Sequence, residues 1–583
     1  MLDYIIVGAG PAGLQMGHHL QGRGRSYLIL EAGASAGTFF AEYPRHRRMI
    51  SINKRFNGFV EPDFNLRHDW NSLLTDNPDL QFTRYSTELF PAAEDYCEYL
   101  REFASKYELA VQYSTRVRHI HHDDDGVFTI TDEQGETHES RTVLMATGVA
   151  RPHVPDIPGI HLAIGYEEHT LDQSFYENKR VAILGRGNSA FEVAEHLAGH
   201  AAVIHILVDR PVKHAWSTHY PGDLRAINNT VLDMYELKSL HATLGLRPIE
   251  LRPHEDGRIE MTVEDDYPHW ETPGTGRATV VYDHVIRCTG WRYLDEKLFD
   301  EDQIPQRTAT GKYPDLSPQW ESSVKGLYWL GTTMAARDRR AASGFIHGFR
   351  YNVRTLFHLL EQQRFGIPYP QERVSYGTGE DLDAVTQRLI TRLSTTSALY
   401  QQFGTLCDAL LLEEEALVHY PELPVAWVQG QPQFMESQSL LLITFEYGFH
   451  KYDDSVQPLD FISPVDPGNP SCTAFIHPVV RHYRAGEVVA ELHLNESLVV
   501  RFDTADYQEL LPQRHLNRLK NFLNSVVQVT SETFPENYVA PDKAAALFQP
   551  WSSRRREELQ KLAPRSGSEC HFVSRAILEQ LAN

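Results

Sequence analysis

The chain has 583 residues, a formal net charge of −23 and an apolar fraction of 42%. This length exceeds what one ordinary hydrophobic core fills, so about three or four domains are expected. The negative charge argues against nucleic acid as a partner. No apolar stretch of about 18 residues occurs, so no membrane span or membrane partner is expected.

A glycine-rich turn follows the first apolar segment. Residues 4–7 (YIIV) predict a strand, and GAGPAG at 8–13 opens a predicted helix. A dinucleotide site requires this context, because unpaired N–H groups at the helix N-terminus bind a pyrophosphate. Glu31 ends the next predicted strand, where a carboxylate accepts a hydrogen bond from a ribose hydroxyl. The expected contacts in the turn are Gly8, Gly10, Pro11, Ala12 and Gly13.

The window from 37 to 69 is rich in arginine, lysine and histidine. Two interpretations stay open: a solvated basic face, or a reaction chamber whose cations bind cofactor phosphates and a substrate carboxylate. On the second interpretation, Lys54 or Arg67 binds the carboxylate and His68 moves a proton. The catalytic candidates are therefore Asn53, Lys54, Arg67 and His68.

Two later segments are expected to complete the same domain. Residues 143–148 (VLMATG) and 326–331 (GLYWLG) are apolar strands that run into small-residue turns. They resemble the later strands of flavoproteins with two dinucleotide folds. Thr332 stands where many disulfide-reductase relatives carry Asp, which favours the monooxygenase branch. Further expected cofactor contacts are Thr38, Phe39, Val117, Thr147, Gly148, Gly331 and Ile346.

A second glycine turn, GRGNSA at 185–190, follows the apolar run 181–184 (VAIL). Its expected contacts are Gly185, Gly187, Asn188 and Ser189. The next strand, 203–207, is followed by Asp209, which would favour NAD, and by Arg210, which would bind the 2′-phosphate of NADP. Arg210 and Lys213 together favour NADPH over NADH. Two turns in this order predict a tightly bound FAD and an NADPH that binds reversibly.

Two further segments in this region bear on the reaction. The polar run 216–229 predicts either an active-site insert or a surface turn followed by a helix cap. Gly165 and His169 keep the core of the class B flavin monooxygenase fingerprint, whereas its flanking aromatic residues are replaced by Ala163 and Gln173.

The tail has no glycine motif. Helix-like residues 380–418 precede strand-like runs at 439–445 and 487–493, and 516–527 and 552–562 are again helix-like. This pattern predicts an α+β domain that caps the site, dimerises or binds a partner. The fold class is α/β, with an FAD domain (1–160 and 283–367), an NAD(P)H domain (161–282) and the C-terminal α+β domain (368–583).

Cysteine usage bears on the compartment and on the chemistry. The five cysteines lie far apart, none forms Cys-x-x-Cys, and Met1 lies close to the first predicted strand. A cytoplasmic protein is expected. A flavin-linked dithiol mechanism is disfavoured, because it needs two neighbouring redox-active cysteines. No metal site is expected.

Several long runs resemble one family, that of FAD-dependent oxidoreductase domain-containing protein 2, the ER flavoprotein associated with degradation. They are 43–47 (YPRHR), 50–55 (ISINKR), 64–74 (FNLRHDWNSLL), 185–192 (GRGNSAFE), 222–229 (GDLRAINN) and 344–351 (GFIHGFRY). The likeness covers about residues 3–365 well and the tail more thinly. It implies FAD and NAD(P)H as cofactors. The chain is more loosely similar to bacterial flavin-dependent amino-acid N-monooxygenases of the nitrosuccinate-forming type, which implies an amine substrate with carboxylates.

Three functions follow from these patterns. The first is an NADPH-consuming monooxygenase that acts through a C4a-hydroperoxyflavin, with O2 and a small amine or amino acid such as L-aspartate as substrates. The second is an NAD(P)H-dependent flavin oxidoreductase with a protein or small-molecule acceptor. The third is a degenerate flavoprotein whose tail recruits another protein, which two intact glycine turns argue against. A homodimer is compatible with all three.

Overall fold

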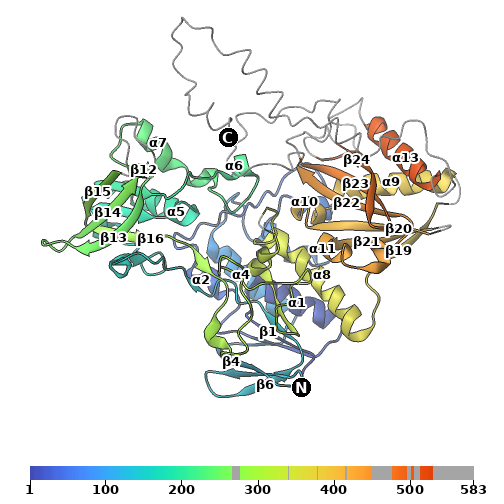
Figure 1. Ribbon diagram of the computed structural model, residues 1–583, viewed down its shortest axis with the longest axis horizontal. Helices are drawn as coiled ribbons and strands as arrows, with labels where there is room; N and C mark the ends of the chain where they lie inside the picture. The colour runs from blue at the N-terminus through green and yellow to red at the C-terminus, as the bar shows by residue number, and fades with distance from the viewer. Residues whose placement is uncertain are drawn as a thin grey trace, which may run out of the picture.

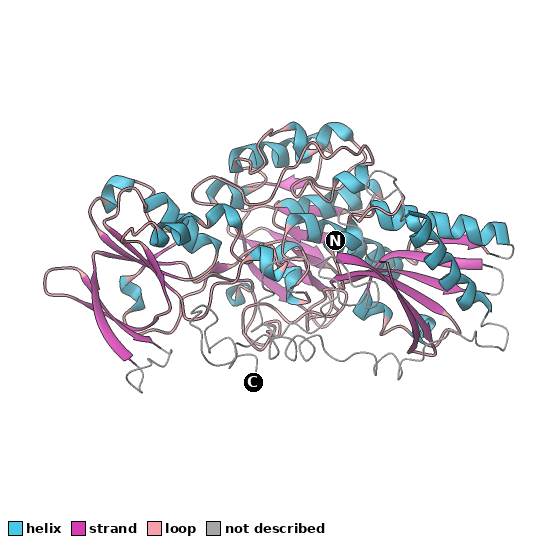
Figure 2. Ribbon diagram, turned by 90° about the horizontal axis from the view of Figure 1, so that it is seen from above, coloured by secondary structure: helices cyan, strands magenta, loops and turns pink. Residues whose placement is uncertain are grey.

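The structure is a computed structural model that describes residues 1–265, 276–338, 340–376, 379–413, 416–447, 476–494, 500–503 and 512–528. Three sheet-centred regions lie side by side (Figures 1 and 2). The N-terminal region occupies the lower centre of Figure 1, the second region lies to its left, and the C-terminal sheet lies to its right.

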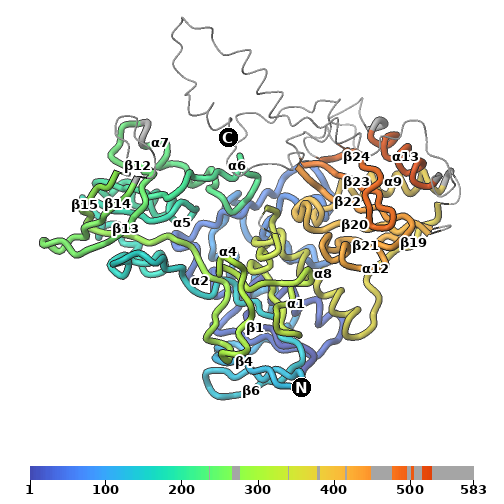
Figure 3. Tube along the Cα trace, in the orientation of Figure 1, coloured from blue at the N-terminus to red at the C-terminus, as the bar shows by residue number. Residues whose placement is uncertain are grey.

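The first region is built on a parallel sheet with the strand order β18-β7-β1-β2-β3. Every residue of β1 is buried, as expected for a parallel sheet covered on both faces. Helix α8 returns from far along the chain to lie beside α1 (Figure 3). The elements are β1 (Tyr4–Val7), α1 (Pro11–Gly22), β2 (Tyr27–Leu30), β3 (Val111–Gln112), β7 (Val143–Met145), β18 (Leu327–Trp329) and α8 (Ile346–Phe365).

The second region is a parallel sheet with the order β12-β11-β10-β16-β9. The elements are β9 (Ile164–Gly165), β10 (Arg180–Leu184), α5 (Asn188–Leu197), β11 (Val203–Leu207), α6 (Ala215–Thr218), α7 (Thr230–Glu236), β12 (Ala242–Leu244) and β16 (His284–Arg287). One boundary differs from expectation: β16 hydrogen-bonds to β10, so this sheet extends beyond residue 282. The physical reason is burial, because Val285 and Ile286 of β16 are fully buried when this strand pairs with β10.

Small antiparallel sheets and short helices join these regions. The β8–β17 pair lies at the two crossings between the parallel sheets. The elements are α2 (Thr38–Glu42), α3 (Pro62–Asn65), α4 (Ala93–Lys106), β4 (Val117–His122), β5 (Phe128–Asp132), β6 (Thr137–Ser140), β8 (Arg151–Pro152), β13 (Arg247–Pro253), β14 (Ile259–Asp265), β15 (Gly276–Tyr282) and β17 (Trp291–Arg292).

The C-terminal region is an antiparallel sheet with the order β19-β21-β20-β22-β23-β24, and α9 packs against α13 beside it (Figure 1). The elements are β19 (Glu372–Ser375), α9 (Gly379–Thr395), α10 (Ala398–Gln401), β20 (Leu406–Leu412), β21 (Ala416–Pro424), α11 (Val425–Val428), α12 (Pro432–Met435), β22 (Leu440–Tyr447), β23 (Ile476–Arg484), β24 (Glu487–His493) and α13 (Pro512–Gln528).

The expected strands at 439–445 and 487–493 and the helix at 516–527 are confirmed. The expected helical stretch 380–418 is wrong beyond residue 405, because the apolar run there forms β20 between two buried strands. The expected helix at 552–562 lies outside the described residues. Across the part of the chain that the structure describes, no helix has both the length and the apolar character needed to cross a membrane.

Candidate functional site

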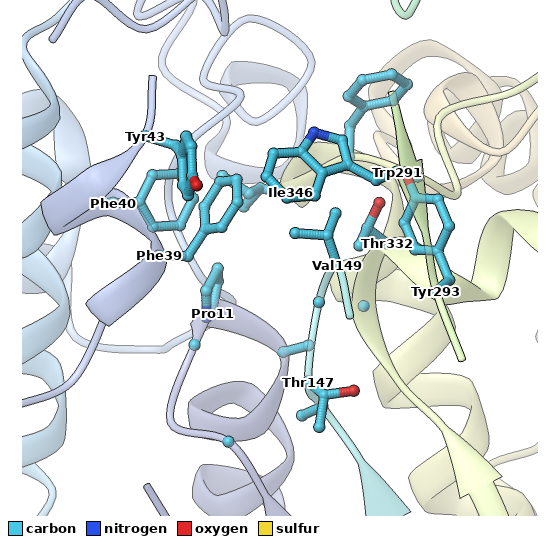
Figure 4. Close-up of a pocket in the computed structure, with 18 of the residues that line it drawn as sticks. Pro11, Phe39, Phe40, Tyr43, Thr147, Val149, Trp291, Tyr293, Thr332 and Ile346 are labelled. Carbon is cyan, nitrogen blue, oxygen red and sulfur yellow. The ribbon is translucent and has the colours of Figure 1, made fainter. Parts of the chain in front are cut away.

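A cavity of about 820 Å³ lies between the two parallel sheets, and residues of both glycine turns line it. In the close-up, Phe39, Phe40 and Tyr43 lie across from Trp291 and Tyr293, with Pro11 and Thr147 toward the first sheet (Figure 4). Fourteen of the expected cofactor contacts line this cavity: Gly8, Gly10, Pro11, Ala12, Glu31, Thr38, Phe39, Val117, Thr147, Gly148, Asn188, Ser189, Gly331 and Ile346.

The first turn has a shape that only glycine allows at two positions. Gly8 has φ +109, and a Cβ there would lie 2.6 Å from the Ala146 carbonyl oxygen. A Cβ on Gly13 would lie 2.0 Å from the carbonyl oxygen of Gly8, so Gly13 serves close packing and does not line the cavity. At Gly10 a Cβ would meet no atom within 4 Å. The backbone of Gly10 is therefore open to a ligand, as a pyrophosphate site requires.

Glu31 holds this turn together from the end of β2. Its carboxylate accepts hydrogen bonds from Ala9 N at 2.6 Å, Gly33 N at 2.7 Å and Thr38 Oγ1 at 2.9 Å. The side chain is buried and still lines the cavity. This position fits the expected acceptor for a ribose hydroxyl, because a carboxylate has acceptor sites beyond these three bonds.

The second turn repeats this geometry. Gly185 has φ +141, and a Cβ there would lie 2.3 Å from the Cys288 carbonyl oxygen. A Cβ on Gly187 would meet nothing within 4 Å, and α5 begins directly after it. Neither glycine lines the cavity, whereas Asn188 and Ser189 do. Arg210 lies outside the cavity, with an exposed side chain whose Nε is 3.5 Å from Asp209 Oδ2.

The aromatic walls of the cavity were not among the expected contacts, apart from Phe39. The ring of Tyr43 lies 5.0 Å from Phe39 and 5.2 Å from Trp291, which joins the two sides of the cavity (Figure 4). A second stack, between Trp70 and His347, has ring centroids 4.0 Å apart. Both Trp70 and His347 lie within the runs that carry the family resemblance. The resemblance was therefore the sequence feature that could have identified them as site residues.

None of the four catalytic candidates lines the cavity, and their side chains are bonded elsewhere, packed elsewhere or exposed to solvent. Asn53 is buried, and its Nδ2 donates to the carbonyl oxygens of Ser86 and Glu88 at 2.8 and 3.3 Å. Lys54 is exposed, and the half-buried His68 packs edge-on against Phe64 at 5.3 Å. These positions do not support roles at the reacting atoms.

Arg67, the fourth candidate, connects the first region to the C-terminal region. Its guanidinium is buried and donates to the carbonyl oxygens of Thr396, Val500 and Leu393 at 2.9, 3.1 and 3.0 Å. Packing against Phe64, Tyr400 and Phe445 covers the rest of the group. A guanidinium held in this way is not available to bind a substrate carboxylate in the cavity, so this expectation is corrected.

Glu192 on α5 is an acidic residue in the cavity wall that was not among the site residues predicted from the sequence motifs. Its carboxylate accepts from Tyr166 Oη at 3.0 Å and from His46 N at 3.2 Å. Burial raises the pKa of this carboxyl to about 7. The cavity therefore holds an acid that changes charge near neutral pH, which is a property common at functional sites.

We expect Glu192→Gln to change how the melting temperature Tm depends on pH. The folded state favours the protonated carboxyl, so wild-type stability falls as pH rises between about 4.5 and 7, the unfolded and folded pKa values. Glutamine removes this loss, so wild-type Tm should fall relative to the variant from pH 5 to 8 by thermal unfolding. Glu168→Gln, which removes the charge of an exposed glutamate outside the cavity, controls for charge removal. Parallel Tm curves for wild type and Glu192→Gln would reject this assignment.

The cysteines that the structure describes do not line the cavity. Cys97, Cys288 and Cys407 are free and buried. Burial raises the pKa of the Cys288 thiol, which keeps it protonated and unreactive. Cys472 and Cys570 lie outside the described residues.

Comparisons with known proteins agree with this geometry. A family model described as pyridine nucleotide-disulphide oxidoreductase matches residues 5–331. FAD-dependent oxidoreductase domain-containing protein 2 of Mus musculus is 37% identical over 580 residues, covering 92% of this chain and 82% of the mouse protein. The chain belongs to this family. The resemblance seen in the motifs is thus confirmed, and the Danio rerio member is 35% identical, covering 83% of this chain and 76% of its own length.

Members of the FAD-dependent oxidoreductase domain-containing protein 2 family typically combine FAD with a pyridine nucleotide. The cavity fits this pair, because Gly8 and Gly10 of the first turn and Asn188 and Ser189 of the second turn line it. The chain is therefore an FAD-dependent oxidoreductase. A more distant relative, probable indole-3-pyruvate monooxygenase YUCCA4 of Arabidopsis thaliana, is 26% identical, covering 58% of this chain and 86% of its own length.

Proposed function

We propose that the chain is an NADPH-consuming flavoprotein monooxygenase that oxidises the amine of a small carboxylate-bearing amino acid, with L-aspartate as the first candidate. One observation carries the proposal: the cavity joins both nucleotide turns, and no cysteine among the described residues lines it. With no cysteine of the described residues at the cavity to take the electrons, O2 is the simplest acceptor. The monooxygenase name of the distant plant relative agrees with this direction.

Specific residues would hold the two cofactors. The turn at Gly8 and Gly10 would bind the FAD pyrophosphate, with Glu31 toward the ribose. Asn188 and Ser189, at the start of α5, would bind the phosphates of the nicotinamide dinucleotide. Bound FAD supplies hydride acceptance from NADPH and reducing equivalents for O2. Arg210 supports NADPH over NADH, because an exposed guanidinium just beyond β11 suits a 2′-phosphate.

The residues of the chain would exclude water from the site and would hold or release a proton. Phe39, Tyr43 and Trp291 form apolar walls around the reacting region (Figure 4). Such walls protect an oxygen-activating site, since water there would divert the reaction to hydrogen peroxide. Glu192 can hold or release a proton near neutral pH at its carboxyl oxygen beside Tyr166 Oη.

The test is NADPH oxidation in air with hydrogen peroxide recorded in parallel, across the amino acids and simple amines. We expect L-aspartate or another carboxylate-bearing amine to accelerate NADPH use while peroxide stays well below the NADPH consumed. NADH at equal concentration should support a slower rate. Peroxide that accounts for all the NADPH with every amine would contradict the proposal and favour an oxidase, or a reductase with another acceptor.

A further inference from the structure

Arg225 places a positive charge in the cavity without a negative partner among the described residues. Its side chain is half-buried and lines the cavity, and the described residues provide it no ion pair. Burial lowers the pKa of its guanidinium, and no acidic group in the described part of the chain offsets that effect. Cations taken out of water are normally paired with an anion, so an unpaired one in a ligand cavity indicates an anionic ligand.

The surroundings of Arg225 fix its position across the cavity. Its backbone N donates to Asn188 Oδ1 at 2.9 Å, which anchors it beside the second glycine turn. Its Nη1 donates to the carbonyl oxygen of Ile50 at 3.0 Å, and its Cζ lies 5.0 Å from the Trp70 ring. The side chain thus reaches from the second region to the first. One such bond leaves most of the five guanidinium donors for a ligand.

A second observation at the same place comes from His347. This residue lines the cavity, is 1% exposed and stacks on the same Trp70 ring at 4.0 Å. Its Nδ1 is buried and has no hydrogen-bond partner in the described residues. Burial, with the charges of Arg350 and Arg225, holds the pKa of His347 well below its ordinary value, so the ring is neutral and one of its nitrogens carries a hydrogen.

We propose that Arg225 and His347 form the site that binds the substrate's carboxylate in this cavity. The proposal rests on the proposed function and gives its substrate an anchoring point. A guanidinium provides parallel N–H donors that match the two oxygens of a carboxylate, and a neutral histidine adds one more donor. This pair takes the role that the sequence pattern had suggested for Lys54 and Arg67.

An anionic oxygen group near Arg225 has two sources, a substrate carboxylate and a phosphate of NADPH. The position of Arg225 favours the first source, because its side chain extends away from the turn at Asn188 to the Ile50 carbonyl and Trp70 of the first region. A phosphate at the second turn has the N-terminus of α5 as its own binding group.

The experiment titrates oxidised, FAD-loaded protein with succinate and follows the visible absorption spectrum of the flavin. Succinate carries two carboxylates but no amine to oxidise, and succinamide is its neutral counterpart. We expect a saturable change with succinate and none with succinamide. Arg225→Gln should weaken succinate binding at least about tenfold, because a charge-assisted hydrogen-bonded pair is lost. Arg225→Lys should keep part of the affinity.

Arg55→Gln is the matched control, because it removes the same charge from an exposed side chain that does not line the cavity. It should bind succinate within about twofold of wild type. Anaerobic titration with NADPH provides the second readout, in which Arg225→Gln should change NADPH affinity less than about threefold. FAD content and Tm of each variant show whether it has folded. If Arg225→Gln does not fold, Arg225→Lys tests the site in its place.

Two results would overturn this assignment. One is a loss of NADPH affinity in Arg225→Gln with unchanged succinate binding, which would assign the charge to the cofactor phosphate. The other is the lack of any spectral change in wild type with acetate, succinate or L-aspartate up to about 10 mM. Failure of the monooxygenase proposal is separate: succinate binding that depends on Arg225, in an enzyme that releases only peroxide, would keep this site and reject that function.

Discussion

Gly10→Leu is expected to give a folded protein that no longer retains FAD. Gly10 has φ −77, which leucine adopts freely, and a Cβ there would meet no protein atom within 4 Å. The new side chain would instead occupy the space where the pyrophosphate approaches the backbone. FAD affinity should fall at least about a hundredfold, a loss of about 2.7 kcal/mol or more. Flavin absorbance per protein after purification measures this directly.

Gly187→Leu is the reciprocal control, because Gly187 has φ −98 and equally open space at the second turn. This variant should remain yellow but should no longer be reduced by low concentrations of NADPH. Circular dichroism should show both variants folded. The assignment of the turns fails if Gly10→Leu keeps its flavin, or if Gly187→Leu loses flavin and binds NADPH normally.

Arg67→Ala is expected to destabilise the protein strongly without altering flavin reduction by NADPH. The substitution leaves three buried carbonyl oxygens without a donor and removes packing against Tyr400 and Phe445. The loss should reach about 3 kcal/mol or more, since each unsatisfied group costs about 1–3 kcal/mol. For a chain of 583 residues that unfolds as one unit, thermal unfolding should show Tm lower by about 2.5 °C or more.

Arg55→Ala is a suitable comparison for Arg67→Ala, because Arg55 is an exposed arginine of the same basic window. Its Tm should stay within about 1 °C of wild type. The rate of flavin reduction, measured well below Tm, separates a structural role from a chemical one. If Arg67→Ala keeps the wild-type Tm but loses flavin reduction, Arg67 acts at the reacting site and the structural role assigned to it is wrong.

Both glycine turns could be predicted from the sequence because their information is local. The strand, the turn and the helix are adjacent in the chain, and positive φ at Gly8 and Gly185 leaves glycine as the suitable residue. Glu31 is found by the same reasoning, since it ends the next strand of the same unit. Gly8 and Glu31 therefore line the cavity as expected, whereas Gly185 does not line it and lies against the carbonyl of Cys288.

The catalytic candidates failed because their environment depends on contacts far along the chain. Arg67 donates to carbonyl oxygens 329 and 433 residues away, in a region whose packing no local pattern reveals. A cluster of cations in sequence does not tell which of them faces a cavity, since burial and partner choice decide that. Arg225, in a polar run with two open interpretations, lines the cavity without an ion pair in the described residues, and it is half-buried, whereas Arg48 and Arg116, which also line the cavity, are exposed.

The C-terminal region shows that the spacing of apolar residues does not always distinguish a buried helix from a buried strand. Residues 406–412 (LCDALLL) are almost continuously apolar, a pattern that a buried helix and a buried strand share. Pairing with β21 and β22 on both sides selects the strand, and that pairing is non-local. The helix at α13 was predictable because its apolar residues recur at helical spacing over a long segment.

Anaerobic addition of NADPH to the protein as purified tests the central claim most directly. If one cavity joins the two nucleotide turns, the protein is yellow, and one equivalent of NADPH bleaches the visible flavin band without any added substrate or protein. Readmitting air should then restore the colour. A protein that carries FAD but stays fully yellow with excess NADPH and with excess NADH would contradict the account, because its two turns would then not bring flavin and nicotinamide together.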